Sequence, residues 1–105
     1  MDDQTAEAMF NVVAKEVAEY IMHPSLEERL IEQLQKKLTF LSGVSLNLYP
    51  NQKSIEADIC FFIDGSKKEK AQVYVHCEKT KQGIAAKGTV NLGQVLYTCN
   101  PRIYD

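Results

Sequence analysis

The sequence IEADICFFIDGSKKEKAQVYVHC, residues 55–77, holds two alternating segments separated by a polar break, and it decides the fold. Apolar side chains take every second position of residues 55–63, a segment rich in isoleucine and phenylalanine. Such a period of two predicts a strand. The alternation stops at the DGS sequence of residues 64–66 and resumes over residues 71–77, after a lysine-rich run. The two segments therefore predict a β-hairpin, one face of which the rest of the chain has to cover.

Length and composition bound the organisation of the chain. Its 105 residues suffice for one hydrophobic core, so we expect a single domain, helical over about residues 5–41 and a sheet over about residues 44–104. The net charge of −2 gives no reason to expect nucleic-acid binding. The sequence has no run of about 18 apolar residues, so it predicts no membrane span, and its acidic start does not fit a signal peptide.

The first predicted helix covers residues 5–22. His23-Pro24 ends it, because proline cannot continue the helical hydrogen bonds. Its apolar residues recur at steps of three and four and form one stripe, which is typical of a helix that packs on a core. These residues are Ala6, Met9, Phe10, Val13, Val17, Tyr20 and Ile21.

The second predicted helix covers residues 26–40. Ser25 and Glu28 have the spacing of a capping box, and Ser42-Gly43 is expected to end the helix. Its predicted apolar rail consists of Leu26, Leu30, Leu34, Leu38 and Leu41. A single bent helix over residues 5–40 is the alternative, and we favour two helices or a sharp kink at the proline.

Strands are predicted before and after the hairpin. Residues 44–49 form the first, and a turn at residues 79–83 precedes a further strand that starts near Ile84. Gly88 and Gly93 indicate a bulge or a break in that strand, and the tail after Cys99 is a candidate edge strand. The order predicts an α+β fold, with two N-terminal helices packed on a mostly antiparallel four- to five-stranded sheet. One sheet face is then covered and the other partly wet.

The sequence predicts no catalytic site, no metal site and no cofactor. Cys60 and Cys77 belong to opposite faces of the hairpin, so a disulfide between them is unfavourable and reduced thiols are expected. The two histidines and three cysteines match no zinc spacing. Glu56 and Asp58 lie two apart on one strand face, where an acid/base pair is conceivable, but a solvated strand face is the preferred interpretation.

Charge is unevenly distributed along the chain. Residues 2–32 carry eight acids against two bases, whereas residues 67–87 carry six lysines against two acids. The acidic helical half is a candidate surface for other proteins, such as a basic amphipathic peptide, because opposite charge steers encounter. The candidate residues are Glu16, Glu19, Glu27 and Glu28. A solvated helix face is the preferred interpretation, and the partner surface is a hypothesis.

Two further functions are compatible with the pattern. Phe62 and Tyr74 are expected to be neighbours on the exposed sheet face, where they are candidates for a homodimer contact. A small-ligand site between the helices and the sheet is the other alternative. Such a site needs polar groups that converge on an apolar cavity, and the predicted inward positions supply none.

Two segments resemble a mitochondrial family. FFIDGS at residues 61–66 and VYVH at residues 73–76 resemble the aromatic-x-hydrophobic-x-Gly-Ser…Val-x-Val hairpin of the cytochrome c oxidase assembly factor one proteins and of the intermembrane-space domain of the Tim-twenty-one subunit of the presequence translocase. Residues 9–11 with His23-Pro24, and residues 96–104, are similar to the family's helix and closing strands. The family's usual membrane-spanning helix is missing from this sequence, and Lys70 replaces a common glycine.

The resemblance implies a non-enzymatic module for protein import or respiratory-complex assembly in the mitochondrial intermembrane space. Without the resemblance, a cytoplasmic location is the default expectation. The resemblance transfers no catalytic or binding residue to this chain.

Overall fold

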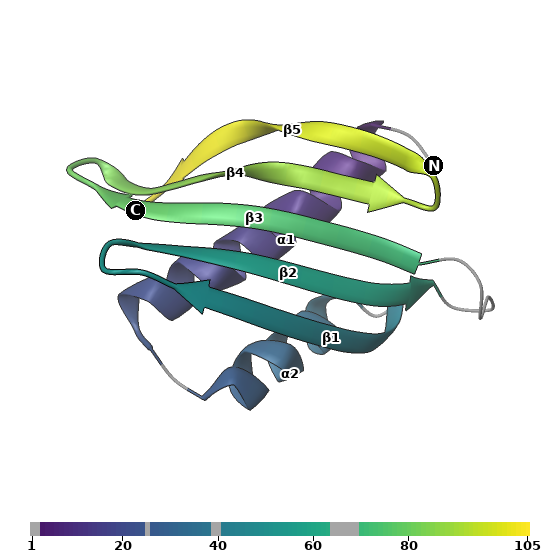
Figure 1. The fold of residues 1–105 in the computed structure, drawn as a ribbon, viewed down its shortest axis with the longest axis horizontal. Helices are drawn as coiled ribbons and strands as arrows, with labels where there is room; N and C mark the ends of the chain where they lie inside the picture. Colours follow the sequence, from purple (N-terminus) through teal and green to yellow (C-terminus); the bar gives the residue numbers. More distant parts are fainter. Residues whose placement is uncertain (1–2, 25, 39–40, 64–69) are drawn as a thin grey trace.

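The computed structural model describes residues 3–24, 26–38, 41–63 and 70–105. It has two layers, with both helices on one face of a five-stranded antiparallel sheet (Figure 1). The predicted α+β class is therefore confirmed. The elements in chain order are α1 Asp3–Met22, α2 Glu27–Lys37, β1 Leu41–Pro50, β2 Ser54–Ile63, β3 Lys70–Thr80, β4 Gly83–Leu92 and β5 Val95–Tyr104.

The sheet is a meander in which each strand pairs with its sequence neighbours, in the order β1-β2-β3-β4-β5. The predicted hairpin is its centre, where Ile55 lies opposite Cys77 and Ile59 opposite Val73. Both pairs are buried on the face toward the helices, as the alternation predicted. The expected DGS turn lies outside the described residues.

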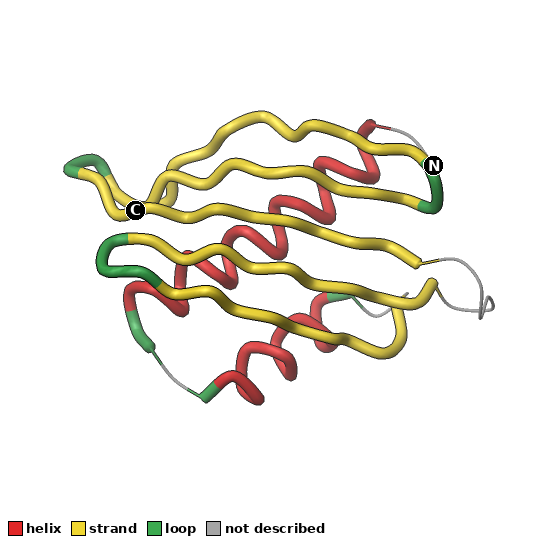
Figure 2. The backbone as a smooth tube through the Cα atoms, in the orientation of Figure 1, coloured by secondary structure: helices red, strands yellow, loops and turns green. Residues whose placement is uncertain are grey.

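Helix α1 covers the apolar face of the sheet. It runs diagonally behind the strands, with its first turns near β5 and its last turns near β2 (Figure 2). The predicted stripe is buried, except that Tyr20 is only half-buried. Phe10 from the helix and Phe61 from the sheet are both at most 1% exposed. Burial of one such side chain contributes about 2–3 kcal/mol, so α1 supplies much of the free energy that closes the core.

Helix α2 is shorter than predicted and lies alongside β1 and α1. Its N-cap residue is Leu26, which makes no side-chain cap hydrogen bond, so the helix starts later than a capping box at Ser25 requires. Ser25 itself lies outside the described residues. Leu30, Leu34 and Leu38 are buried as predicted, but Leu26 is 73% exposed. The prediction that Leu26 belongs to the buried rail is wrong, because the residue precedes the first helical turn.

Strand β1 begins earlier than predicted, and this corrects two residues. Leu41 belongs to the strand and not to the helical rail, and Gly43 does not end a helix. Gly43 has a φ of +66° in a bulge, where two residues of β1 oppose Phe61 of β2. The sequence feature typical of a helix C-terminus also suits a bulge, because both need a positive φ.

The two C-terminal strands explain the predicted glycine interruptions. Gly93 has a φ of +66° in the two-residue turn between β4 and β5, which confirms the predicted break into two strands. The tail after Cys99 continues β5 to Tyr104 as the edge strand. Beside Gly88, β5 contains a bulge in which Asn100 and Pro101 oppose Lys87.

Gly88 of β4 lies against the backbone of β3, opposite Val75. A Cβ atom at this position would lie 1.9 Å from the Tyr74 carbonyl oxygen, which belongs to the backbone and cannot rotate away. We therefore expect Gly88→Ala to lower the free energy of unfolding by at least about 3 kcal/mol or to prevent folding. Gly93→Ala is the matched control, since nothing lies within 4 Å of its Cβ position and only the positive φ is strained.

Urea titration of both variants by circular dichroism measures this difference. The control is expected to lose about 1–2 kcal/mol. Equal losses in the two variants would contradict the close approach at Gly88.

Candidate functional site

The four acids of the predicted partner surface do not form one exposed patch. Glu19, Glu27 and Glu28 are exposed, but Glu16 is only 8% exposed. The Glu16 carboxylate forms an ion pair with the Lys37 ammonium group at the end of α2. Glu16 is therefore neutralised inside the α1–α2 contact, and its structural role is to join the two helices.

Two of the remaining acids, Glu19 and Glu28, line two adjoining depressions on the helical side. Glu19 lines a groove of about 270 Å³ between α1 and α2, whose wall also contains Tyr20 and Leu30. Glu28 and Glu32 line a second depression beside the exposed Leu26. Arg29 belongs to both walls, so the two depressions adjoin. We call this combined region the acidic helix surface, and it consists of Glu19, Tyr20, Leu26, Glu28, Arg29, Leu30 and Glu32.

The acidic helix surface combines carboxylates with apolar side chains. Its three acids outnumber its one base, Arg29, and the exposed Glu27 lies at the same end of α2. Leu26, at 73%, is the most exposed of the large apolar side chains in the described residues. Such a combination suits the two faces of an amphipathic cationic helix.

The prediction that Phe62 and Tyr74 are neighbours on the outer sheet face is wrong. Both face away from the helices, but the register pairs Phe62 with Lys70 and Tyr74 with Asp58. Four residues of strand, about 13 Å, therefore separate the two side chains along the sheet. The Phe62 ring lies against Gly43 of β1, where an added Cβ would be 3.0 Å from its Cδ2 atom. Its aromatic surface covers the glycine of the bulge.

The outer sheet face carries a cross-strand polar cluster. Glu56 lies opposite His76, with 3.5 Å between its Oε1 and the histidine Nδ1. Partial burial, with the neighbouring Glu56 carboxylate as the second cause, raises the pKa of Tyr74. Asp58 instead accepts a hydrogen bond of 3.3 Å from Gln72 Nε2. Glu56 and Asp58 thus have different polar partners in His76 and Gln72, although both carboxylates help to raise the pKa of Tyr74.

The same face is hollowed near the β5 bulge. Glu56, Tyr74, His76, Lys87, Thr98 and Pro101 are among the residues that line a depression of about 530 Å³. The depression is open to solvent, and its charged groups are of both signs. It is the described feature that comes nearest to the small-ligand alternative.

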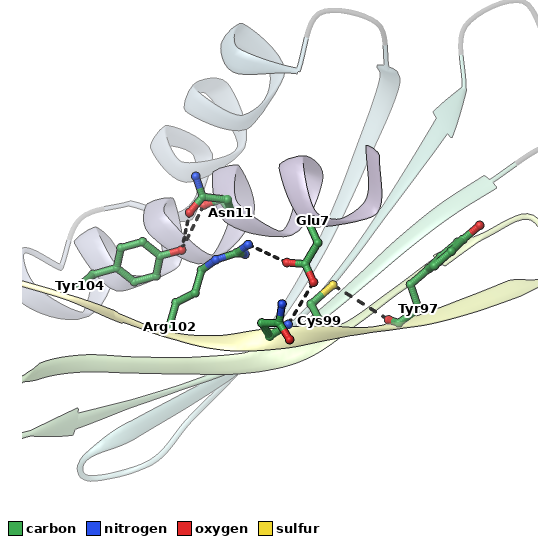
Figure 3. Close-up of polar contacts among 7 residues, drawn as sticks. Glu7, Asn11, Tyr97, Cys99, Arg102 and Tyr104 are labelled. Atoms are coloured by element: carbon green, nitrogen blue, oxygen red, sulfur yellow. Dashed lines mark hydrogen bonds and ion pairs between the residues drawn. The ribbon is translucent and has the colours of Figure 1, made fainter. Parts of the chain in front are cut away.

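A polar contact between α1 and β5 holds the first turns of the helix on the sheet edge (Figure 3). Glu7 accepts hydrogen bonds from Arg102 Nη2 at 2.6 Å and from the Asn100 backbone N–H at 3.1 Å. The Tyr104 hydroxyl donates to Asn11 Oδ1 at 2.8 Å. The Arg102 guanidinium also lies 5.5 Å from the centre of the Phe10 ring, within the range of a cation–π contact.

Sequence reasoning missed this contact because no local signal could reveal it. Glu7 and Arg102 are separated by 95 positions, and each is an ordinary charged residue of its own element. The Asn100 N–H at the bulge points toward the helix, and a bulge in an edge strand leaves no periodic trace in the sequence.

The three cysteines are free, and two of them are protected by burial. Burial raises the pKa of the Cys77 thiol to about 12. Burial, with the nearby Glu7 carboxylate as the second cause, raises that of Cys99 to about 11 against the opposing effect of Arg102. Cys60 lies on the outer face and is half-buried, so Cys60 and Cys77 do point to opposite faces as predicted. Neither of these two thiols, with its raised pKa, suits a nucleophile near neutral pH, because the thiolate is the reactive form.

A metal site and a membrane-spanning helix each have requirements that the described ranges do not meet. Residues 3–24, 26–38, 41–63 and 70–105 bring together no group of three metal-ligating side chains. Within these ranges, no helix is both long enough and apolar enough to cross a membrane.

Thiol labelling should separate the cysteines by burial. At about pH 8, iodoacetamide is expected to label Cys60 in the folded protein and to leave Cys77 and Cys99 unmodified, whereas urea exposes all three. Peptide mass spectrometry reads the sites. Labelling of Cys77 as fast as Cys60 would contradict the packing of β3 against α1.

The raised pKa of Cys77 also gives the sign of a pH effect on stability. Its ordinary value is 9.0, so between pH 9.0 and about 12 the folded state holds a proton that the unfolded state releases. Stability is therefore expected to fall as pH rises through this window, and Cys77→Ala should reduce that fall.

Comparisons with known proteins give no relative for this arrangement. A scan of protein-family models finds no match, and neither curated proteins nor solved structures match the chain significantly.

Proposed function

We propose that this domain is a non-enzymatic protein-interaction module that binds a basic amphipathic segment of another protein on the acidic helix surface. One observation carries the proposal, namely the exposed acids Glu19, Glu28 and Glu32 beside the exposed Leu26. Lysine or arginine side chains of the segment would contact the carboxylates. Its apolar face would cover Leu26 and the groove with Tyr20 and Leu30.

The free energy for binding would come mainly from the apolar contact. Exposed ion pairs contribute about 0–1 kcal/mol each, so the carboxylates mostly steer encounter and orient the segment. Burial of Leu26 would add about 2 kcal/mol. Arg29 in the same surface would repel a cation placed directly over it. The surface therefore favours segments whose cationic side chains contact the carboxylates on either side of Arg29.

The rival function is that of a small-ligand binder. The layer between α1 and the sheet is filled by side chains that are at most 8% exposed, which argues against a ligand site there. The outer depression near Lys87 is open and has mixed charge. Neither feature matches the enclosed apolar pocket that small ligands prefer.

The proposal also includes a mitochondrial location for this binding. The hairpin resemblance supports a role in protein import or respiratory-complex assembly on the intermembrane-space side of the inner membrane. A basic amphipathic segment is also the chemistry of a targeting sequence, so the two parts of the proposal agree.

A peptide-binding measurement tests the acidic helix surface. The probe is a fluorescent synthetic helix with lysines on one face and leucines on the other, and its control is a scrambled peptide of the same composition. The triple variant Glu19→Lys/Glu28→Lys/Glu32→Lys is expected to raise the Kd at least about tenfold, because attraction becomes repulsion. Glu16 stays unchanged, since its reversal would break the ion pair with Lys37.

Glu78→Lys on the sheet is the matched control, and it is expected to leave the Kd unchanged. Wild-type binding should weaken as salt rises, because the encounter is electrostatic. Equal binding of the scrambled peptide, or an unchanged Kd in the triple variant, would refute the proposed surface.

A capture experiment tests the mitochondrial setting. Wild type and the triple variant serve as baits in mitochondrial and whole-cell lysates, and mass spectrometry quantifies the bound proteins. We expect translocase or oxidase-assembly proteins of the inner membrane to be enriched by wild type and lost with the variant. If the peptide binds but no such protein is enriched, the binding surface stands and the mitochondrial setting fails.

A further inference from the structure

The two edges of the sheet differ in how they are protected against pairing with another strand. The β5 edge contains the bulge at Asn100 and Pro101, and the Asn100 N–H is already bonded to Glu7. Arg102 adds a charge to the same strand. Bulges, prolines and charges are the usual means by which proteins block edge pairing.

The β1 edge is less protected than the β5 edge. None of the ten residues of β1, Leu41–Pro50, is charged. Between the bulge, which ends at Val44, and Pro50, residues 45–49 form a regularly paired strand of about 17 Å. Within the described part of the chain, this strand pairs only with β2.

The part of the core beneath β1 is also incompletely buried. Its inward side chains Val44, Leu46 and Leu48 are only half-buried, although they pack against the core. The inward side chains of β2 and β3 at the same level, such as Ile59 and Val73, are fully buried. An additional strand beside β1 would complete the burial of this apolar row.

We propose that β1 pairs with β1 of a second copy of this chain across a twofold axis, which joins the two sheets into one ten-stranded antiparallel sheet. Residues that face each other in an antiparallel pair share a sheet face. The axis therefore passes through Leu46 or Asn47, so that the apolar rows of the two copies join. In either register Asn47 lies next to Asn47 or Ser45 of the second copy.

A second copy fits this edge for electrostatic reasons. A twofold axis brings each residue near its own copy, and β1 has no charge that would repel itself. Helix α2 lies alongside β1, with Glu27 and Glu28 in its first turn and Lys36 and Lys37 in its last. The same axis makes the two α2 helices antiparallel, so the acidic end of each lies toward the basic end of the other.

Sedimentation equilibrium from about 1 to about 300 µM tests the pairing, because dimerisation depends on concentration. Wild type is expected to form dimers. The variant Ser45→Lys/Asn47→Lys places lysines on exposed positions that meet across the axis, and it is expected to raise the dimer Kd at least about tenfold. The variant Leu96→Lys/Thr98→Lys is the matched control, with the same spacing and face on the β5 edge, and its Kd should stay within about twofold of wild type.

Amide hydrogen exchange provides a second readout that does not depend on any variant. Protection of the β1 amides should rise with protein concentration, whereas protection of the β5 amides should not. A wild type that stays monomeric at about 300 µM, or a dimer dissociated equally by the control variant, would overturn the proposal. Peptide binding to the helices is measured separately, so failure of the dimer leaves the proposed function intact.

Discussion

The structure depends on covering one apolar sheet face with one helix. Inward side chains of β2, β3 and β4 are buried along most of their length, and α1 is the element that lies across all three. Without α1, the sheet would expose a row of isoleucine, valine and phenylalanine side chains to water, at a cost of about 25 cal/mol for each Å². The other elements either extend this sheet or secure the helix on it.

Polar contacts hold the two ends of the helical layer. Glu7 binds Arg102 at the β5 edge, and Glu16 binds Lys37 of α2. Both carboxylates belong to the acidic N-terminal part of the sequence, yet they serve the packing and not the surface charge. The acids left for a partner are those at the α1–α2 groove and the start of α2.

The free surface is divided between the two layers. The helical side offers carboxylates beside Leu26, whereas the outer sheet face offers mixed charge around His76 and an uncharged edge at β1. A partner helix would contact the α1–α2 groove, whereas a second copy would pair along the β1 edge, with α2 next to both sites. Backbone hydrogen bonds would dominate at the edge, and side-chain contacts would dominate on the helices.

The sequence by itself determined the class of fold and the central hairpin. Strict alternation over residues 55–63 and 71–77 assigns alternate apolar side chains to one sheet face, where Ile55, Ile59, Val73 and Cys77 are buried, and the stripe of α1 matches the face so formed. Only the tertiary structure decided the fate of Leu26, Gly43 and Glu16. Leucine, glycine and glutamate are each compatible with several environments, and the choice depends on which element lies beside them. The distance between Phe62 and Tyr74 was likewise set by the strand register. Alternation predicts which sheet face each residue occupies, but it does not predict which residues pair across the two strands.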